Sequence, residues 1–154
     1  MKRDLTTAAL GGGVGGLLDA VYAIVAWGLI PGNGIPFVFQ SVASALLGLN
    51  AWTGGLRTAT FGFVLHLFVA FVMALVYVRA SRRLRVLVAR PVLMGVLYGL
   101  LLFVIMNFVV IPLTAIGYRS PSAWGFWRAL LPHILILGPA IALITARRDS
   151  KPIS

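Results

Sequence analysis

The chain lacks cysteine and glutamate, and it has few charged residues of any kind. None of its 154 residues is cysteine, which excludes a disulfide framework, thiol chemistry and thiolate metal sites. Its three acidic residues are all aspartates, and charged residues make up 10% of the chain, where a soluble domain carries about 25%. A chain so poor in charge is expected to have the bilayer as its solvent.

Apolar and basic residues are present in excess. Hydrophobic residues make up 60% of the chain, the mean hydropathy is +1.01, and the formal net charge is +10. Nucleic-acid-binding proteins can also be this basic. Here, however, the arginines cluster just outside apolar segments, and aromatic residues do not interleave with them. The basic residues therefore indicate membrane topology and contact with lipid, and no nucleic-acid partner.

Apolar segments of membrane-spanning length predict an all-α integral membrane protein formed by a single membrane domain. A helix rises ~1.5 Å per residue, so about 20 residues cross a hydrocarbon core ~30 Å thick. Four segments have this length, at about 7–29, 58–78, 92–114 and 123–146. The apolar segment 36–52 is shorter and has a polar edge, so we predict a re-entrant or interfacial helix there.

The distribution of basic residues predicts the orientation of the chain. With four crossings and the N-terminus inside, ten basic residues lie on the inner side and three on the outer side. If segment 36–52 also crossed, the arginine-rich loop after the second span would face outside, against the positive-inside bias. We therefore predict that both termini are cytoplasmic.

The first span combines a glycine-rich stripe with the one acidic residue predicted to lie inside the membrane. At 100° per residue, Gly12, Gly15 and Asp19 fall on one helical face. Small residues at this spacing let another helix approach closely, and a carboxyl group at this depth must face protein or water. We expect this face to pack against other helices.

Depth counting predicts a buried polar cluster from mid-membrane to the outer half. Polar groups in lipid turn inward and partner one another, so we expect Asp19 to pair with a histidine from another span, either His66 or His133. The side chains of the predicted cluster are Asp19, Tyr22, Gln40, His66, Asn107 and His133.

Two groups of arginines lie in the predicted loops or near the ends of the predicted spans. The loop after the second span is expected to anchor the topology and to attract anionic inner-leaflet lipid, at about 1 kcal/mol per charge. Its arginines are Arg79, Arg82, Arg83, Arg85 and Arg90. An outer group, Arg57, Arg119 and Arg128, would form a basic mouth above the polar cluster.

The polar cluster supports three hypotheses on function. In the leading one, the protein is a small channel or transporter-like protein whose Asp–His core relays protons below an anion-favouring mouth. In the alternative, it is a structural or accessory subunit, and the cluster fixes helix register through hydrogen bonds worth roughly 0.6 kcal/mol each. In the third, His66 and His133 bind one b-type haem. Because four short helices enclose little space, we expect a homo-oligomer or a larger membrane complex.

Motifs for catalysis and for metal binding are absent from the sequence. There is no nucleophile elbow and no H-E-x-x-H pair, so we expect no enzymatic activity. The run GGGVGG lacks the Lys-Ser/Thr that follows a phosphate-binding loop. A zinc site needs at least three protein ligands, and the spans offer two histidines and one carboxylate. Haem in the third hypothesis is the one cofactor considered, and no metal is expected.

Six stretches of the chain carry a family resemblance: FQSVASALLG at 39–48, GGLRTATFGFVLHLFVAF at 54–71, VYVRASRRL at 76–84, RPVLMGVLYG at 90–99, VIMNFVVIPLTA at 104–115 and HILILGPAIAL at 133–143. With these stretches the chain resembles a family of small, uncharacterised bacterial inner-membrane proteins, and more distantly the YagU-like inner-membrane proteins. The resemblance implies a four-helix protein of the bacterial cytoplasmic membrane and assigns no activity to any residue. His66, Asn107 and His133 fall within these stretches, whereas Asp19 falls outside them.

Overall fold

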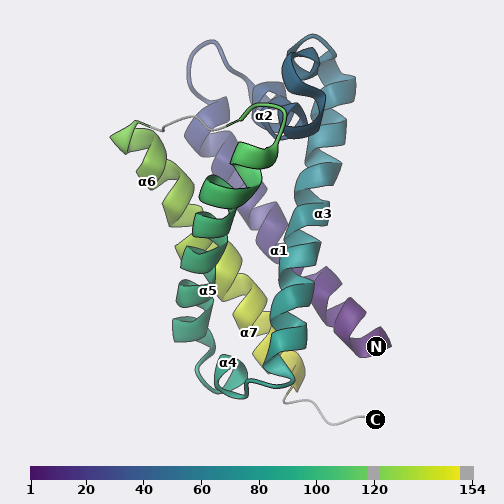
Figure 1. Cartoon of the computed structure of the whole chain (residues 1–154), viewed down its shortest axis with the longest axis vertical. Helices are drawn as coiled ribbons and strands as arrows, with labels where there is room; N and C mark the ends of the chain where they lie inside the picture. Colours follow the sequence, from purple (N-terminus) through teal and green to yellow (C-terminus); the bar gives the residue numbers. More distant parts are fainter. Residues whose placement is uncertain (118–121, 150–154) are drawn as a thin grey trace.

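The computed structural model describes residues 1–117 and 122–149, and these residues form helices joined by turns, without a strand (Figure 1). The α-helices are α1 (Lys2–Ala23), α2 (Ile35–Leu47), α3 (Gly55–Ser81), α4 (Val86–Ala89), α5 (Pro91–Ile105), α6 (Ala123–Pro132) and α7 (Gly138–Asp149). Three π-helical turns, η1 (Ile24–Gly28), η3 (Met106–Val110) and η5 (His133–Leu137), and two 3-10 turns, η2 (Gly48–Trp52) and η4 (Ile111–Leu113), continue them.

The all-helical class expected from composition is confirmed. By length and apolar composition, five segments of the described chain could cross a membrane. They are Lys2–Gly28, Ile35–Trp52, Gly55–Ser81, Pro91–Leu113 and Ala123–Asp149. Four of them overlap the four predicted spans, which extend at most one residue beyond them. The fifth, Ile35–Trp52, is the segment expected to be re-entrant or interfacial, and η2 extends it to 18 residues.

The segment formed by α2 and η2 lies at one end of the bundle, opposite the N-terminus (Figure 1). We call this the distal end, and the end that holds the start of α1 and the end of α7 the terminal end. Helix α1 leads to the distal end through η1, and α3 starts from it. Two hydrogen bonds join this segment to its neighbours. Gln40 Nε2 donates to the carbonyl of Gly55 at 3.1 Å, and the amide of Ala115 donates to the carbonyl of Ala45 at 2.9 Å. The chain therefore enters and leaves the α2–η2 segment at the same end of the bundle.

Glycines bring α1 close to two helices at once. A Cβ atom at Gly12 would lie 2.6 Å from the Cα atom of Phe71 on α3, where no real side chain fits. A Cβ atom at Gly15 would lie 3.1 Å from Cδ1 of Leu137 in η5. The predicted close approach is thus confirmed, but Gly12 and Gly15 face different partners. Helix α1 is wedged between α3 and the last span, with Gly16 also against α3.

Two glycines of the third predicted span, Gly95 and Gly99, have the same role. A Cβ atom at Gly95 would lie 2.7 Å from the Cα atom of Pro139, and one at Gly99 would collide with the carbonyl of His133. The backbones of α5 and of the last span are therefore nearly in contact, as expected for helices that associate through small residues. This contact holds His133 at a defined position beside α5.

The hydrophobic core is small and made largely of short side chains. It contains Ala8, Ala70, Ala74, Tyr77, Val78, Leu102, Leu137, Ile141 and Ala142. The phenol of Tyr77 donates to the carbonyl of Leu87 at 2.8 Å, and that of Tyr98 donates to the carbonyl of Met73 at 2.7 Å. Large apolar side chains such as Leu18 and Phe68 point outward, as expected where lipid is the solvent.

Candidate functional site: an aspartate–histidine pair between two cavities

Asp19 on α1 and His66 on α3 form the pair of ionisable side chains at the centre of the candidate site. Asp19 Oδ2 lies 3.6 Å from His66 Nε2. The pair is close because Gly16, one turn before Asp19, lets α3 approach: a Cβ atom there would lie 2.9 Å from that of Ala70. Of the two pairings that the sequence left open, Asp19 with His66 is the one within ion-pair distance in the described chain.

The predicted burial of this cluster is wrong. The side chain of Asp19 keeps 14% of its surface exposed, and that of His66 keeps 19%. Neither is sealed in a packed core, because both face open space between the helices. This space forms two cavities, which share Asp19, Val42 and His66.

The first cavity has a volume of about 410 Å³ and lies between α1, η1, α2 and α3. Its walls are largely aromatic and aliphatic, with Asp19, Ser41 and His66 as their polar side chains. The lining residues are Asp19, Ala20, Ala23, Trp27, Phe37, Val38, Phe39, Ser41, Val42 and His66.

The second cavity has a volume of about 220 Å³ and brings together four of the six side chains predicted to form a cluster. Asn107 and His133 line it together with Asp19 and His66. Its other walls are mainly apolar, from Val42, Val69, Ala70, Met73, Met106, Ile111, Ala129 and Leu137. Depth counting thus found side chains that share a cavity, although they come from four different spans.

The predicted hydrogen bonding between members of the cluster is not observed in the described chain, where Asp19 and His66 approach each other only to 3.6 Å. Asn107 Nδ2 donates to the carbonyl of Phe103 at 2.9 Å, and His133 Nδ1 bonds to the carbonyl of Ala129 at 2.8 Å. Both side chains belong to π-helical turns, η3 and η5, and return to a carbonyl of the preceding turn. One polar atom of each side chain is therefore partnered within its own helix. Such turns recur at functional sites, and the sequence pattern carried no signal for them.

The carbonyl partners determine which ring nitrogens of the histidines carry a proton. His66 Nε2 lies 2.9 Å from the carbonyl of Gly16, and a carbonyl only accepts, so Nε2–H of His66 is the donor. By the same argument, Nδ1–H of His133 donates to Ala129. The distance of 3.6 Å from His66 Nε2 to Asp19 exceeds that of a hydrogen bond. The acceptor positions of the Asp19 carboxylate are consequently left open to the cavities.

Gln40 and Tyr22 do not join the site. Gln40 is buried in the contact of α2 with α3, where Nε2 donates to Gly55 and, at 3.4 Å, to Thr58 Oγ1. Tyr22 is half-buried on α1, and neither cavity includes it among its walls. The reason is rotation about the helix axis, which depth counting does not measure.

One arginine of the predicted basic mouth lies near the first cavity. The guanidinium carbon of Arg128 lies 5.2 Å from the ring centre of Trp27, which lines that cavity, and 5.1 Å from that of Trp124. Both distances are typical of cation–π contacts. Arg57 is exposed at the start of α3. The third predicted member, Arg119, lies outside the described residues.

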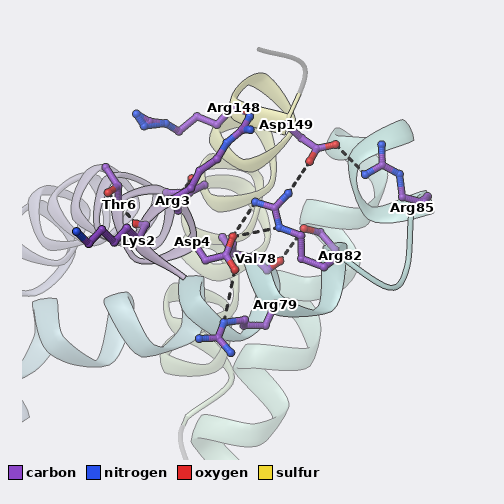
Figure 2. Close-up of polar contacts among 12 residues, drawn as sticks. Lys2, Arg3, Asp4, Thr6, Val78, Arg79, Arg82, Arg85, Arg148 and Asp149 are labelled. Carbon is purple, nitrogen blue, oxygen red and sulfur yellow. Dashed lines mark hydrogen bonds and ion pairs between the residues drawn. The ribbon is translucent and has the colours of Figure 1, made fainter. Parts of the chain in front are cut away.

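At the terminal end, three of the five loop arginines bind carboxylates (Figure 2). Arg82 contacts Asp4 on α1 at 2.7 Å and Asp149 on α7 at 2.9 Å. Arg85 contacts Asp149 at 2.9 Å, and Arg79 lies 3.7 Å from Asp4. We call the set of Asp4, Arg79, Arg82, Arg85 and Asp149 the clamp. The sequence analysis did not predict the clamp. Asp4 precedes the first predicted span and Asp149 follows the last, so both lie on the side of the arginine-rich loop.

The clamp changes what is expected of the five loop arginines. Arg79, Arg82 and Arg85 have carboxylate partners within the protein, so part of their charge is compensated. Contact with anionic lipid stays a prediction, and it falls most directly on Arg83 and Arg90. The predicted homo-oligomer or larger complex likewise stays a prediction.

Metal and haem chemistry were weighed against the same geometry. Among residues 1–117 and 122–149, no group of three or more His, Cys, Asp or Glu side chains could hold a metal ion. His66 and His133, considered above as haem ligands, line one cavity, but each bonds a backbone carbonyl through one ring nitrogen. Haem binding remains an untested hypothesis.

No protein-family model, no curated protein and no solved structure matches this chain. The resemblance to small bacterial inner-membrane proteins and to YagU-like proteins therefore stays a prediction. The fold and the site define an all-helical protein with segments long and apolar enough to span a membrane, and with an aspartate–histidine pair set between two cavities.

Proposed function

We propose that this protein is a small channel or transporter-like membrane protein that moves protons, or a solute linked to protons, with Asp19 and His66 as its working pair. The observation that carries the proposal is the open carboxylate of Asp19, set beside His66 and shared by two cavities. Ionisable residues within spans are costly and typically mark ion or substrate pathways.

The proposal includes four spans, a re-entrant or interfacial α2–η2 segment and cytoplasmic termini in a bacterial inner membrane. It is supported by the path of the chain, which enters and leaves α2–η2 at the distal end (Figure 1). It is also supported by the arginines between α3 and α5 at the terminal end, which fit the positive-inside rule. In this orientation the cavities lie toward the outer side, and the clamp lies at the inner side.

In the proposed mechanism, carboxylate and imidazole exchange protons with water that enters the cavities. Asp19 supplies acceptor positions, and the His66 ring is oriented by the carbonyl of Gly16. A small rotation would bring the two groups from 3.6 Å to hydrogen-bond distance. Asn107 and His133 shape the second cavity while their own helix turns hold them in place.

The competing function is that of a structural or accessory subunit. The hydrogen bonds of Asn107 and His133 to their own helices favour a structural role for these two residues. They do not account for Asp19, whose carboxylate is left open. A flux measurement distinguishes the two functions, because a purely structural protein transports nothing.

The test uses purified protein in liposomes with a pH gradient and a trapped pH-sensitive dye. Wild-type protein should dissipate the gradient, and Asp19→Asn and His66→Ala should each return the rate to that of empty liposomes. Tyr22→Phe is the matched control, since Tyr22 is on the same helix and lines neither cavity. Wild-type flux that persists in both Asp19→Asn and His66→Ala would refute the proposal.

A further inference from the structure

We propose that the first cavity binds a protonated primary amine with an apolar, ring-sized body, its ammonium group on Asp19. This inference rests on the proposed function, because it names the class of solute for the same site. It is carried by three features of the cavity: the kind of polar groups it presents, its walls and its volume.

The polar groups in the cavity wall are acceptors with few donors to offer. The Asp19 carboxylate accepts only. Ser41 has already given its hydroxyl hydrogen to the carbonyl of Val38 at 2.6 Å, so its lone pairs face other partners. His66 has given Nε2–H to the carbonyl of Gly16. A ligand that supplies donors and positive charge complements this set, whereas a carboxylate or a phosphate would lie beside the ionised Asp19 carboxylate, which repels it.

The walls exclude a bare inorganic cation as the best occupant. Calcium takes six to eight oxygen ligands, and magnesium demands a near-ideal octahedron. Here one carboxylate and one hydroxyl stand among Trp27, Phe37 and Phe39. An ammonium group needs only a few acceptors and is also attracted to aromatic faces. The apolar walls would then bury the body of the ligand.

The volume matches a small organic molecule. About 410 Å³ lies within the range of roughly 300–1,000 Å³ that is typical of small-molecule pockets. The second cavity, of about 220 Å³, is below this range and is more suited to water or to one end of a ligand. Asp19 and His66 belong to both, so the charged end of a ligand in the first cavity lies where the two meet.

Arg128 opposes binding of a cation, so a variant of Arg128 should change the affinity for the amine in the opposite direction to a variant of Asp19. Its guanidinium lies over Trp27, a wall residue, and is held by two indole rings. A positive charge at this place repels an ammonium ion in the cavity. Removing it should therefore strengthen binding of the amine, whereas removing the charge of Asp19 should weaken it.

The experiment is calorimetric titration of the full chain in detergent with three ligands of matched shape. They are phenethylamine, protonated at neutral pH, the neutral 2-phenylethanol and the anionic 3-phenylpropionate. We expect the amine to bind most tightly. Its affinity should fall at least tenfold in Asp19→Asn, rise severalfold in Arg128→Gln and stay unchanged in Tyr22→Phe.

Asp19→Glu keeps the charge and separates loss of charge from loss of fold. It should retain amine binding within severalfold, and thermal unfolding of each variant checks that it is folded. Equal binding of amine and alcohol, tighter binding of the anion, or unchanged amine affinity in Asp19→Asn would each overturn the inference. Asp19-dependent amine binding without proton flux would overturn only the proposed proton transport, and flux without amine binding would overturn only the inference.

Discussion

The two carboxylates of the clamp and the carboxylate of Asp19 are of the same kind and nearly equally exposed, yet they are partnered differently. The exposed fractions are 17% for Asp4, 16% for Asp149 and 14% for Asp19, so burial does not separate them. Asp4 and Asp149 accept charged hydrogen bonds from arginines at 2.7 and 2.9 Å. Asp19 has His66 at 3.6 Å, with the donor of that nitrogen directed at a backbone carbonyl.

This difference indicates that the carboxylates of the clamp stabilise the fold, whereas the carboxylate of Asp19 is available to other partners. Arg82 presents its guanidinium fork to two carboxylates and thereby ties α1 and α7 to the end of α3 (Figure 2). Its donors and their acceptors are matched, which is what a stabilising network requires. At Asp19 acceptors exceed donors, so the site is incomplete without a proton, water or a ligand. The open carboxylate of Asp19 is therefore the one suited to taking up a proton or binding a ligand.

The largest expected effect comes from neutralising the open carboxylate. Asp19→Asn should reduce proton flux in liposomes to the rate of empty liposomes, because the group that takes up the proton is lost. Its thermal unfolding temperature in detergent should not fall, since no hydrogen bond to the carboxylate is removed. A large loss of thermal stability with flux retained would assign Asp19 to the structural group instead.

Breaking the clamp should lower stability and leave proton flux intact, which is the opposite of the result expected for Asp19→Asn. Arg82→Ala leaves Asp4 and Asp149 without their shared partner, and hydrogen bonds to charged groups are worth about 1.5–3 kcal/mol before solvent screening reduces them. We expect a loss of about 2 kcal/mol in the free energy of unfolding, measured in detergent. Flux per folded protein should persist. Arg83→Ala, at a neighbouring exposed position, is the control.

Coupling within the clamp sharpens the comparison further. A double-mutant cycle of Asp4→Asn and Arg82→Gln should give an interaction free energy of about 1 kcal/mol in unfolding experiments, as for residues within one network. The corresponding cycle of Asp4→Asn with His66→Gln joins opposite regions and should be additive. Strong coupling between Asp4 and His66 would mean that the two regions act as one unit.

Salt should produce the next smaller effect. The Debye length falls from about 10 Å at 0.1 M to about 3 Å at 1 M salt, so the partly exposed clamp is screened. We expect 1 M sodium chloride to lower the unfolding temperature of the wild type and to change that of Arg82→Ala much less. Equal sensitivity of the two proteins would argue against a stabilising clamp.

The smallest effect is expected at exposed arginines without a carboxylate partner in the described chain. Arg57→Ala and Arg83→Ala should each change the free energy of unfolding by no more than about 0.5 kcal/mol, as is usual for such surface positions. Binding of Arg83→Ala to vesicles with and without anionic lipid would then test the predicted lipid contact separately from stability.

The sequence by itself determined the helical elements of this protein and predicted which of its polar groups lie at a similar depth. Long apolar runs define the helices, because a helix must satisfy its own backbone in lipid. The glycines at 12 and 15 were predicted to lie where helices touch, since only a missing Cβ allows such approach. Asp19 and His66 were predicted at one depth, because the rise per residue is constant along each span.

Only the tertiary structure decided which groups meet at that depth and at the terminal end. The direction in which a side chain points depends on how each helix is rotated against its neighbours, and no single segment encodes this rotation. For that reason Gln40 lies in the α2–α3 contact, His133 bonds to its own helix and Asp19 faces two cavities. For the same reason Arg82 meets acids from opposite ends of the described chain, Asp4 and Asp149. Packing of α1 between α3 and the last span brings these three residues together.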